Sequence, residues 1–212
     1  GLSGDEAHYA LYAAHLDLSY YDHPPLVGWI QWPLVALNAP AGLLRLIPQV
    51  LWVLSAVLVY AIAQRLQGVL APLFASGSSE EASSAGLWAA AAFGVAPMFH
   101  ILGIGLLPDT LLMALTAAVL LQTLRMQDAR EVRRLKAWLL LGGLLGLAGL
   151  AKYTAIFVAI PVVICLIVAH GWRVLRGIGP WVSLLLAVGL VLPVFVWNAQ
   201  HGWISFAYQL HH

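Results

Sequence analysis

The sequence predicts an all-α protein, a polytopic bundle of transmembrane helices with an extracytoplasmic loop that carries interfacial helices. Of its 212 residues, 62% are hydrophobic and only 9% are charged, and the mean hydropathy is +0.88. A soluble domain carries about 25% charged residues, so this composition excludes an ordinary soluble fold. The apolar residues also form runs that can cross a bilayer, which takes about 20 residues for each helix. Third, when these runs are placed as membrane spans, most Lys and Arg residues lie on one side of the membrane.

The first 46 residues predict an extracytoplasmic loop with juxtamembrane helices. The spacing of Ser3 and Glu6 is that of a capping box, which indicates that a helix begins there. Asp5 lies in the first turn of this helix, where the helix dipole favours a carboxylate. Asp5 therefore has a structural as well as a functional interpretation.

The apolar segment 26–44 is long enough to span, but prolines punctuate it and only Arg45 separates it from the next apolar run. Trp29 and Trp32 lie three residues apart, on one face of a helix, and suit the aromatic belt at the membrane–water interface. We therefore predict that 26–44 is a helix lying in the membrane surface.

Residues 47–212 predict a bundle of about six transmembrane helices. The spans are expected at residues 47–66, 86–105, 109–125, 138–151, 153–169 and 180–198. The apolar run 138–168 exceeds one ordinary span of about 30 Å, so it is divided at its polar break around Lys152. Pro97 lies within the second span, where neighbouring helices can satisfy the freed carbonyl groups. The Ser- and Gly-rich stretch 67–85 is predicted to be a flexible connector.

The basic residues test this topology. With these spans, all Lys and Arg residues except Arg45 and Lys152 fall on one side, which is therefore predicted to be cytoplasmic. Seven of the eight histidines, including His211 and His212, fall on the opposite side. The sequence thus places a polar, titratable surface on the extracytoplasmic side of an apolar bundle.

Several residues on that side have two interpretations. Asp109 follows Pro108 and could simply begin a helix. Lys152 could extend its ammonium group to the interface, although ionisable groups at the edge of apolar spans are often functional. His8 follows Asp5 by three residues and could supply part of a metal site, although this pattern is weak evidence without further ligands.

The segment GDEAHYALYAAHLDLSYYDHPPLVGWI resembles the first outer loop of membrane glycosyltransferases related to protein O-mannosyltransferases and the bacterial lipid A aminoarabinose transferase. The resemblance continues through RLIPQVLW, LLPDTLLM, LAKYTA and WNAQHGWISFAYQL. It implies the GT-C fold, the bacterial glycosyltransferase family 39 type, and donors in which a sugar is linked to polyprenyl phosphate. In this family a transmembrane helix precedes the loop and further spans follow, so the resemblance implies an N-terminal part.

The resemblance also implies roles for individual residues. Asp5, with Glu6 beside it, is expected to be the catalytic carboxylate. The residues expected to bind the donor phosphate or the substrate are Lys152, His23, Asp109, Tyr21, Tyr153 and His201. The aminoarabinose transferases have a lysine where this chain has His23, which argues against carrying over their donor specificity.

The chemistry of such a transfer agrees with these residue types. A carboxylate can take the proton of an acceptor hydroxyl, and a cation can stabilise the departing phosphate. A divalent metal ion held by Asp5, Asp109 and His8 could do the same electrostatic work, and no other cofactor is expected.

The resemblance and the topology together predict the setting of the reaction. We expect an inverting transferase in the bacterial inner (plasma) membrane, with its site facing the periplasm. The expected partners are a polyprenyl-phosphate-sugar donor, a lipid, glycan or protein acceptor, and membrane lipids. Nucleic acid is excluded because the chain has no Lys- and Arg-rich arm. The alternative is a transporter or flippase for a lipid or a small solute, although such proteins place ionisable residues near the bilayer midplane.

Overall fold

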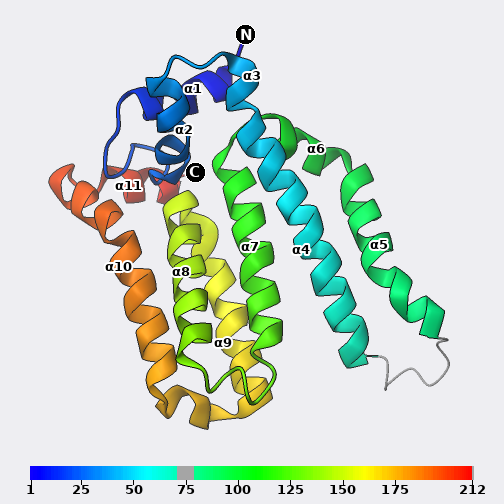
Figure 1. The fold of residues 1–212 in the computed structure, drawn as a ribbon. Helices are drawn as coiled ribbons and strands as arrows, with labels where there is room; N and C mark the ends of the chain where they lie inside the picture. The colour runs from blue at the N-terminus through cyan, green and yellow to red at the C-terminus, as the bar shows by residue number, and fades with distance from the viewer. Residues whose placement is uncertain (71–78, 212) are drawn as a thin grey trace.

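The computed structural model describes residues 1–70 and 79–211, and within these residues every regular element is helical (Figure 1). The α-helices are α1 (Gly4–Ala14), α2 (Leu26–Ala36), α3 (Ala41–Leu44), α4 (Leu46–Leu70), α5 (Ser79–Val95), α6 (Pro97–Ile104), α7 (Pro108–Arg125), α8 (Leu135–Ala151), α9 (Ile156–His170), α10 (Ile178–Gln200) and α11 (Ile204–His211). Two short 3₁₀ turns are η2 (Tyr153–Ala155) and η3 (Trp172–Arg176). The predicted all-α class is confirmed.

The long helices run roughly side by side, and the short ones gather at one end of the bundle (Figure 1). That end, which we call the site end, carries α1, α2, α3, α6 and α11, together with both chain termini. The opposite end, which we call the basic end, carries the α7–α8 connection and η3. Inside the bundle, α8 packs against α10, and α4 packs against α5 and α7.

All six predicted spans are helical, but they differ in length. Three helical stretches are long and apolar enough to cross a membrane: Ala41–Gly68, Tyr153–His170 and Ile178–Gln200. A fourth span results if α5 and α6 count as one. Helix α8 is apolar but has only 17 residues. The total of about six spans stays a prediction.

The predicted span 86–105 is not a straight helix. Its chain bends by 70° between Val95 and Pro97, and α6 turns across the site end (Figure 1). Ala96 has an extended backbone, as expected for a residue that precedes proline. Pro97 then starts α6, where its missing N–H costs no hydrogen bond.

The predicted division at Lys152 is confirmed. Helix α8 ends at Ala151, and Lys152 has an extended backbone with φ −156° and ψ 143°. The turn η2 follows, and α9 then runs back through the bundle (Figure 1). Lys152 therefore lies at the site end.

The segment 26–44 is shorter and less regular than predicted. Helix α2 has 11 residues, and the chain then turns through Asn38, whose φ is +52°, before α3. Trp29 and Trp32 do not share one exposed face: Trp29 is half-buried and its Nε1 donates to the Asp17 carbonyl, whereas Trp32 is exposed. The reason is that Trp29 packs against the core around α1 and α2. Whether α2 lies in a membrane surface stays a prediction.

The predicted flexible connector 67–85 overlaps the end of α4 and the start of α5, which are both helical. Its central part, residues 71–78, lies outside the described residues. The side chains of His211 and His212 lie outside them as well.

Glycines allow α8 to approach α10 closely, as small residues do where membrane helices pack together. A Cβ atom added at Gly142 would lie 2.8 Å from the Ser183 Cα and would also meet the Ser183 carbonyl oxygen. A Cβ atom at Gly146 would lie 2.7 Å from a methyl group of Leu190. At Gly142 the obstacle is backbone, which cannot move aside as a side chain can.

We expect Gly142→Ala to destabilise the bundle by about 1–3 kcal/mol, because overpacking forces α8 and α10 apart. The matched control is Gly143→Ala, since no atom lies within 4 Å of a Cβ at Gly143. The control should melt at the wild-type temperature or slightly above it, because alanine favours a helix by about 1 kcal/mol over glycine. Thermal melting of the purified protein in detergent measures both. Equal melting temperatures for the two variants would contradict the close approach.

Candidate functional site

The segment between α1 and α2 is fastened to the far end of the chain. The Asp17 carboxylate accepts a hydrogen bond of 2.8 Å from Trp197 Nε1 on α10. Ser205 Oγ on α11 donates a bond of 2.9 Å to the Tyr20 carbonyl. These contacts join residues about 180 positions apart and hold the loop over the site end of the bundle.

Glu6 is buried and fully engaged. Arg45 donates from Nε to Glu6 Oε1 at 2.7 Å and from Nη2 to Glu6 Oε2 at 2.8 Å. The Ser3 amide donates to Glu6 Oε2 at 2.7 Å, which completes the predicted capping box. The hydrogen bond with Arg45 is the main reason that the pKa of Glu6 falls to about 2. This geometry favours a structural role for Glu6, which ties α1 to the start of α4, over the predicted share in catalysis.

We expect Glu6→Gln to lower the free energy of unfolding by about 1–3 kcal/mol, because the buried Glu6 side chain loses its charged hydrogen bonds with Arg45. The pKa of Glu6 is lower in the folded state than its unfolded value of about 4.3, so its contribution is present above that pH. The contribution is lost as the pH falls from about 4.3 towards 2. Melting temperatures at pH 6 and pH 3 should therefore differ more for the wild type than for the variant.

The control is Glu131→Gln, which removes an ion pair of 2.6 Å with Arg134 at the protein surface. Such exposed pairs contribute about 0–1 kcal/mol, so this variant should melt close to the wild type. If Glu6→Gln also melted like the wild type at neutral pH, the Glu6–Arg45 pair would not be a structural tie.

Asp5 differs from its neighbour. Its side chain is exposed, and within the described part of the chain no hydrogen bond or ion pair is seen to it. Asp5 and Glu6 are consecutive on a helix, so their side chains point about 100° apart. Glu6 is buried and paired with Arg45, whereas the exposed Asp5 carboxylate is available to a substrate.

Tyr9 of α1 is within electrostatic range of carboxylates from three segments of the chain. Burial is the main reason that the pKa of Tyr9 is raised, and the charges of Asp22, Asp5 and Asp109 add to the effect. Asp5 and Asp109 therefore both act electrostatically on Tyr9, and their grouping in one functional site stays a prediction. Tyr9 therefore remains protonated and uncharged at neutral pH.

Asp22 organises a polar cluster that the sequence did not single out. The Asp22 carboxylate lies 3.1 Å from His23 Nδ1 and 3.3 Å from His8 Nε2, and it accepts a hydrogen bond from the Tyr12 hydroxyl. Burial opposes ionisation, but the bonds from His23 and Tyr12 prevail and hold the pKa of Asp22 well below its usual range. A carboxylate beside Nδ1 orients the His23 ring and leaves its Nε2 for another partner.

Asp109 and Lys152 meet across the site end. Lys152 Nζ donates to Asp109 Oδ1 at 2.6 Å, which links the start of α7 to the α8–α9 turn. Thr110 Oγ1 donates to the carbonyls of Leu102 and Gly105 and so fixes the turn that carries Asp109. Both charged groups are partly exposed, so an incoming anion can reach Lys152 in competition with Asp109.

The other predicted site residues, Tyr153, Tyr21 and His201, make no described contact with Asp5 or Asp109. The Tyr153 hydroxyl lies 3.4 Å from Ser19 Oγ, and Tyr21 is exposed. His201 stacks on Trp197 with ring centroids 3.9 Å apart, and its Nδ1 lies 2.8 Å from the Trp197 carbonyl oxygen. These contacts place His201 at the C-terminal end of α10, without a described contact to Asp5.

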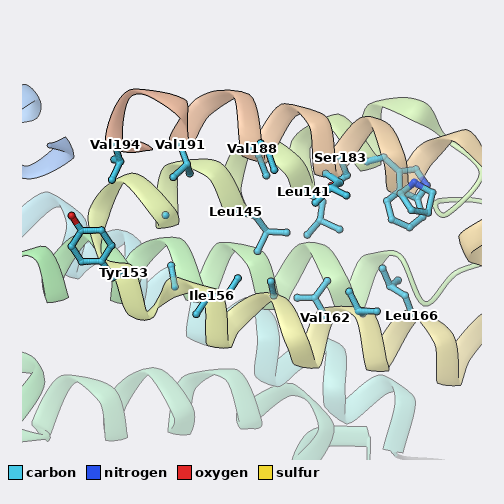
Figure 2. Close-up of a pocket in the computed structure, with 18 of the residues that line it drawn as sticks. Leu141, Leu145, Tyr153, Ile156, Val162, Leu166, Ser183, Val188, Val191 and Val194 are labelled. Carbon is cyan, nitrogen blue, oxygen red and sulfur yellow. The ribbon is translucent and has the colours of Figure 1, made fainter. Parts of the chain in front are cut away.

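An apolar cavity of about 580 Å³ lies between α8, α9 and α10 (Figure 2). Tyr153 and Val194 line one end of it, and Leu166 and Ser183 lie towards the other (Figure 2). Because Tyr153 follows Lys152 directly, the cavity reaches the part of the site end that carries the lysine.

The predicted metal ligands are not grouped. Among the described residues, no three His, Cys, Asp or Glu side chains are arranged to hold a metal ion. Instead, His8 contacts Asp22 and Tyr12, while Asp109 pairs with Lys152. Dependence on a divalent metal ion stays a prediction.

Most of the chain matches one family of known proteins. The model of the dolichyl-phosphate-mannose-protein mannosyltransferase family matches residues 22–197. The chain is also 26% identical over 200 residues to the lipid A galacturonosyltransferase RgtD of Rhizobium johnstonii. That match covers 93% of the chain, but the chain spans only 38% of the length of this relative. No solved structure is significantly similar. The family match includes His23, Asp109 and Lys152, and it begins after Asp5 and Glu6.

Proposed function

The chain belongs to the dolichyl-phosphate-mannose-protein mannosyltransferase family, and from this premise we propose that it is a membrane glycosyltransferase. The donor is a sugar linked to polyprenyl phosphate, and the acceptor is a hydroxyl group of lipid A, another envelope glycan or a protein. The similarity to a protein named as a lipid A galacturonosyltransferase supports a glycolipid acceptor within that range.

The observation that carries this proposal is the ion pair between Asp109 and Lys152, the residue next to Tyr153 at one end of the apolar cavity. The charges of Asp5, Asp22 and Asp109 all act on Tyr9, and Lys152 contacts Asp109. A lipid-linked sugar needs this combination, because its phosphate requires a cation while its chain requires apolar surface. A soluble nucleotide-sugar donor would have no use for the apolar part.

In the proposed reaction, Asp5 takes the proton of the acceptor hydroxyl as that oxygen attacks the anomeric carbon. The bond between this carbon and the phosphate oxygen breaks, and polyprenyl phosphate leaves with the bonding electrons. Attack from the face opposite the phosphate inverts the configuration of the sugar. Asp5 is suited to this role because its carboxylate is exposed, whereas Glu6 is already paired with Arg45.

Lys152 stabilises the phosphate as its negative charge increases. His23 supplies a second contact through Nε2, and Asp22 acts as a positioning residue that fixes the His23 ring. Before the donor arrives, Lys152 is paired with Asp109, and the donor phosphate competes with this carboxylate for the ammonium group.

We place the reaction on the extracytoplasmic face of the bacterial plasma membrane. The site end carries Asp5, Asp22 and Asp109, whereas the arginines of the α7–α8 connection and of η3 lie at the basic end. By the positive-inside rule, the basic end faces the cytoplasm.

Mass spectrometry of envelope glycolipids and glycoproteins, from cells with and without the gene, tests the function. We expect one sugar to disappear from a glycolipid or a glycoprotein when the gene is deleted. Unchanged profiles would contradict the proposal. Movement of a polyprenyl-phosphate sugar across vesicles without transfer to an acceptor would indicate a flippase instead.

A further inference from the structure

The basic end of the bundle contains a second cavity, of about 570 Å³. It lies between the α7–α8 connection, the end of α9, η3 and the start of α10. Its lining combines apolar side chains with Arg133, Arg173 and His170. The proposed reaction takes place at the other end and leaves this cavity without a role.

The cavity has a net positive charge. Arg133 and Arg173 are exposed and line it together, and no Asp or Glu is among the described residues that do so. The nearby Glu131 is paired with Arg134, at 2.6 Å. His170 is held by a contact of 2.7 Å between its Nε2 and the Met126 carbonyl oxygen. The two arginines are therefore available to an anion.

The backbone adds to this positive potential. Helices α8 and α10 both begin at the cavity, and neither has a side-chain hydrogen bond at its N-cap. The amide groups in the first turn of a helix carry a partial positive charge that favours anions. This effect reinforces the arginines.

The charged cavity also adjoins an apolar one. Trp138 and Pro180 line both this second cavity, at the basic end, and the apolar cavity between α8, α9 and α10. Trp172 and Trp181 are exposed near the same end, as is typical of side chains at headgroup depth. A ligand that fills both cavities must therefore have an anionic head and an apolar tail.

We propose that this site binds an anionic phospholipid, with its phosphate between Arg133 and Arg173 and an acyl chain in the apolar cavity. Basic cavities between transmembrane helices bind anionic headgroups in the same way. The net positive charge favours an anionic lipid over a zwitterionic one, and the apolar continuation favours a lipid over a soluble anion.

Native mass spectrometry of the full-length protein with phosphatidylglycerol tests the proposal. The variant Arg133→Gln/Arg173→Gln removes both arginines, and we expect it to bind this lipid about 30-fold more weakly. The matched control Arg130→Gln/Arg176→Gln removes two charges from the same end outside the cavity, and it should change binding less than about threefold. Equal losses in the two variants, or no loss in either, would overturn the site.

Two further probes separate a lipid from a soluble anion. We expect phosphatidylcholine to be retained much less than phosphatidylglycerol, and soluble glycerol 1-phosphate not to compete with it. Competition by glycerol 1-phosphate at concentrations equal to those of the lipid would show that the acyl chain contributes nothing and would refute the proposal. None of these measurements depends on sugar transfer, so they are decided independently of the proposed function.

Discussion

Replacing Asp5 by asparagine is expected to slow sugar transfer by about 100- to 10,000-fold, the range associated with loss of a general base. Asparagine has nearly the same shape but cannot accept the proton of the acceptor hydroxyl. Because Asp5 is exposed, the variant should insert, accumulate and melt as the wild type does. The rate is measured with the full-length protein in proteoliposomes, with saturating polyprenyl-phosphate sugar and acceptor.

Glu6→Gln is the control for this prediction, because it changes the adjacent carboxyl group. We expect this variant to lose stability through the broken contact with Arg45, while the molecules that remain folded transfer sugar within a few-fold of the wild-type rate. Transfer at the wild-type rate by Asp5→Asn would show that Asp5 is not the base. A loss confined to Glu6→Gln, after correction for the folded fraction, would move the catalytic role to Glu6.

The different environments of Asp5 and Glu6 could be predicted only in part from the sequence. The sequence predicts a helix that begins near Ser3, since a capping box is a local pattern. It does not decide which of two consecutive acids is buried, because that depends on a partner 39 residues away, Arg45. Only the folded chain distinguishes Asp5 from Glu6.

The helices likewise include one feature that the local sequence predicts and one that depends on tertiary packing. The division at Lys152 could be predicted, because one polar break interrupts an apolar run too long for a single span. The bend at Pro97 could not, since proline is tolerated in transmembrane helices and its effect depends on the neighbours that receive the chain. In this protein α6 packs against α4 and α7 at the site end, and that tertiary packing accommodates the turn.

The polar cluster around Asp22 does not follow from the sequence for a related reason. The motif that contains His23 predicts a role for the histidine but none for the adjacent acid. Its importance comes from contacts with His8 and Tyr12 on α1, which the loop between the helices brings within reach. An acid directly before a candidate histidine is the signal that could have identified it, because a carboxylate beside Nδ1 orients an imidazole ring.

Replacing Lys152 by methionine is expected to lower kcat/KM for the lipid-linked donor by about 100-fold, because the departing phosphate loses its principal cation. Lys152→Arg retains the charge and should lose less than Lys152→Met. Neither change should alter the melting temperature much, since the ion pair with Asp109 is partly exposed. The measurement is the steady-state rate as a function of donor concentration, again in proteoliposomes.

The variant Asp109→Asn tests whether Asp109 competes with the donor phosphate for Lys152 or positions Lys152 for phosphate binding. If Asp109 only competes with the donor phosphate for Lys152, this variant frees the ammonium group, and we expect the KM for the donor to stay the same or fall. An increase in KM as large as that caused by Lys152→Met would instead mean that Asp109 must hold the lysine in place for the phosphate to bind. An unchanged kcat/KM in Lys152→Met would show that Lys152 does not bind the donor phosphate, because loss of its positive charge would then have no effect on the leaving group.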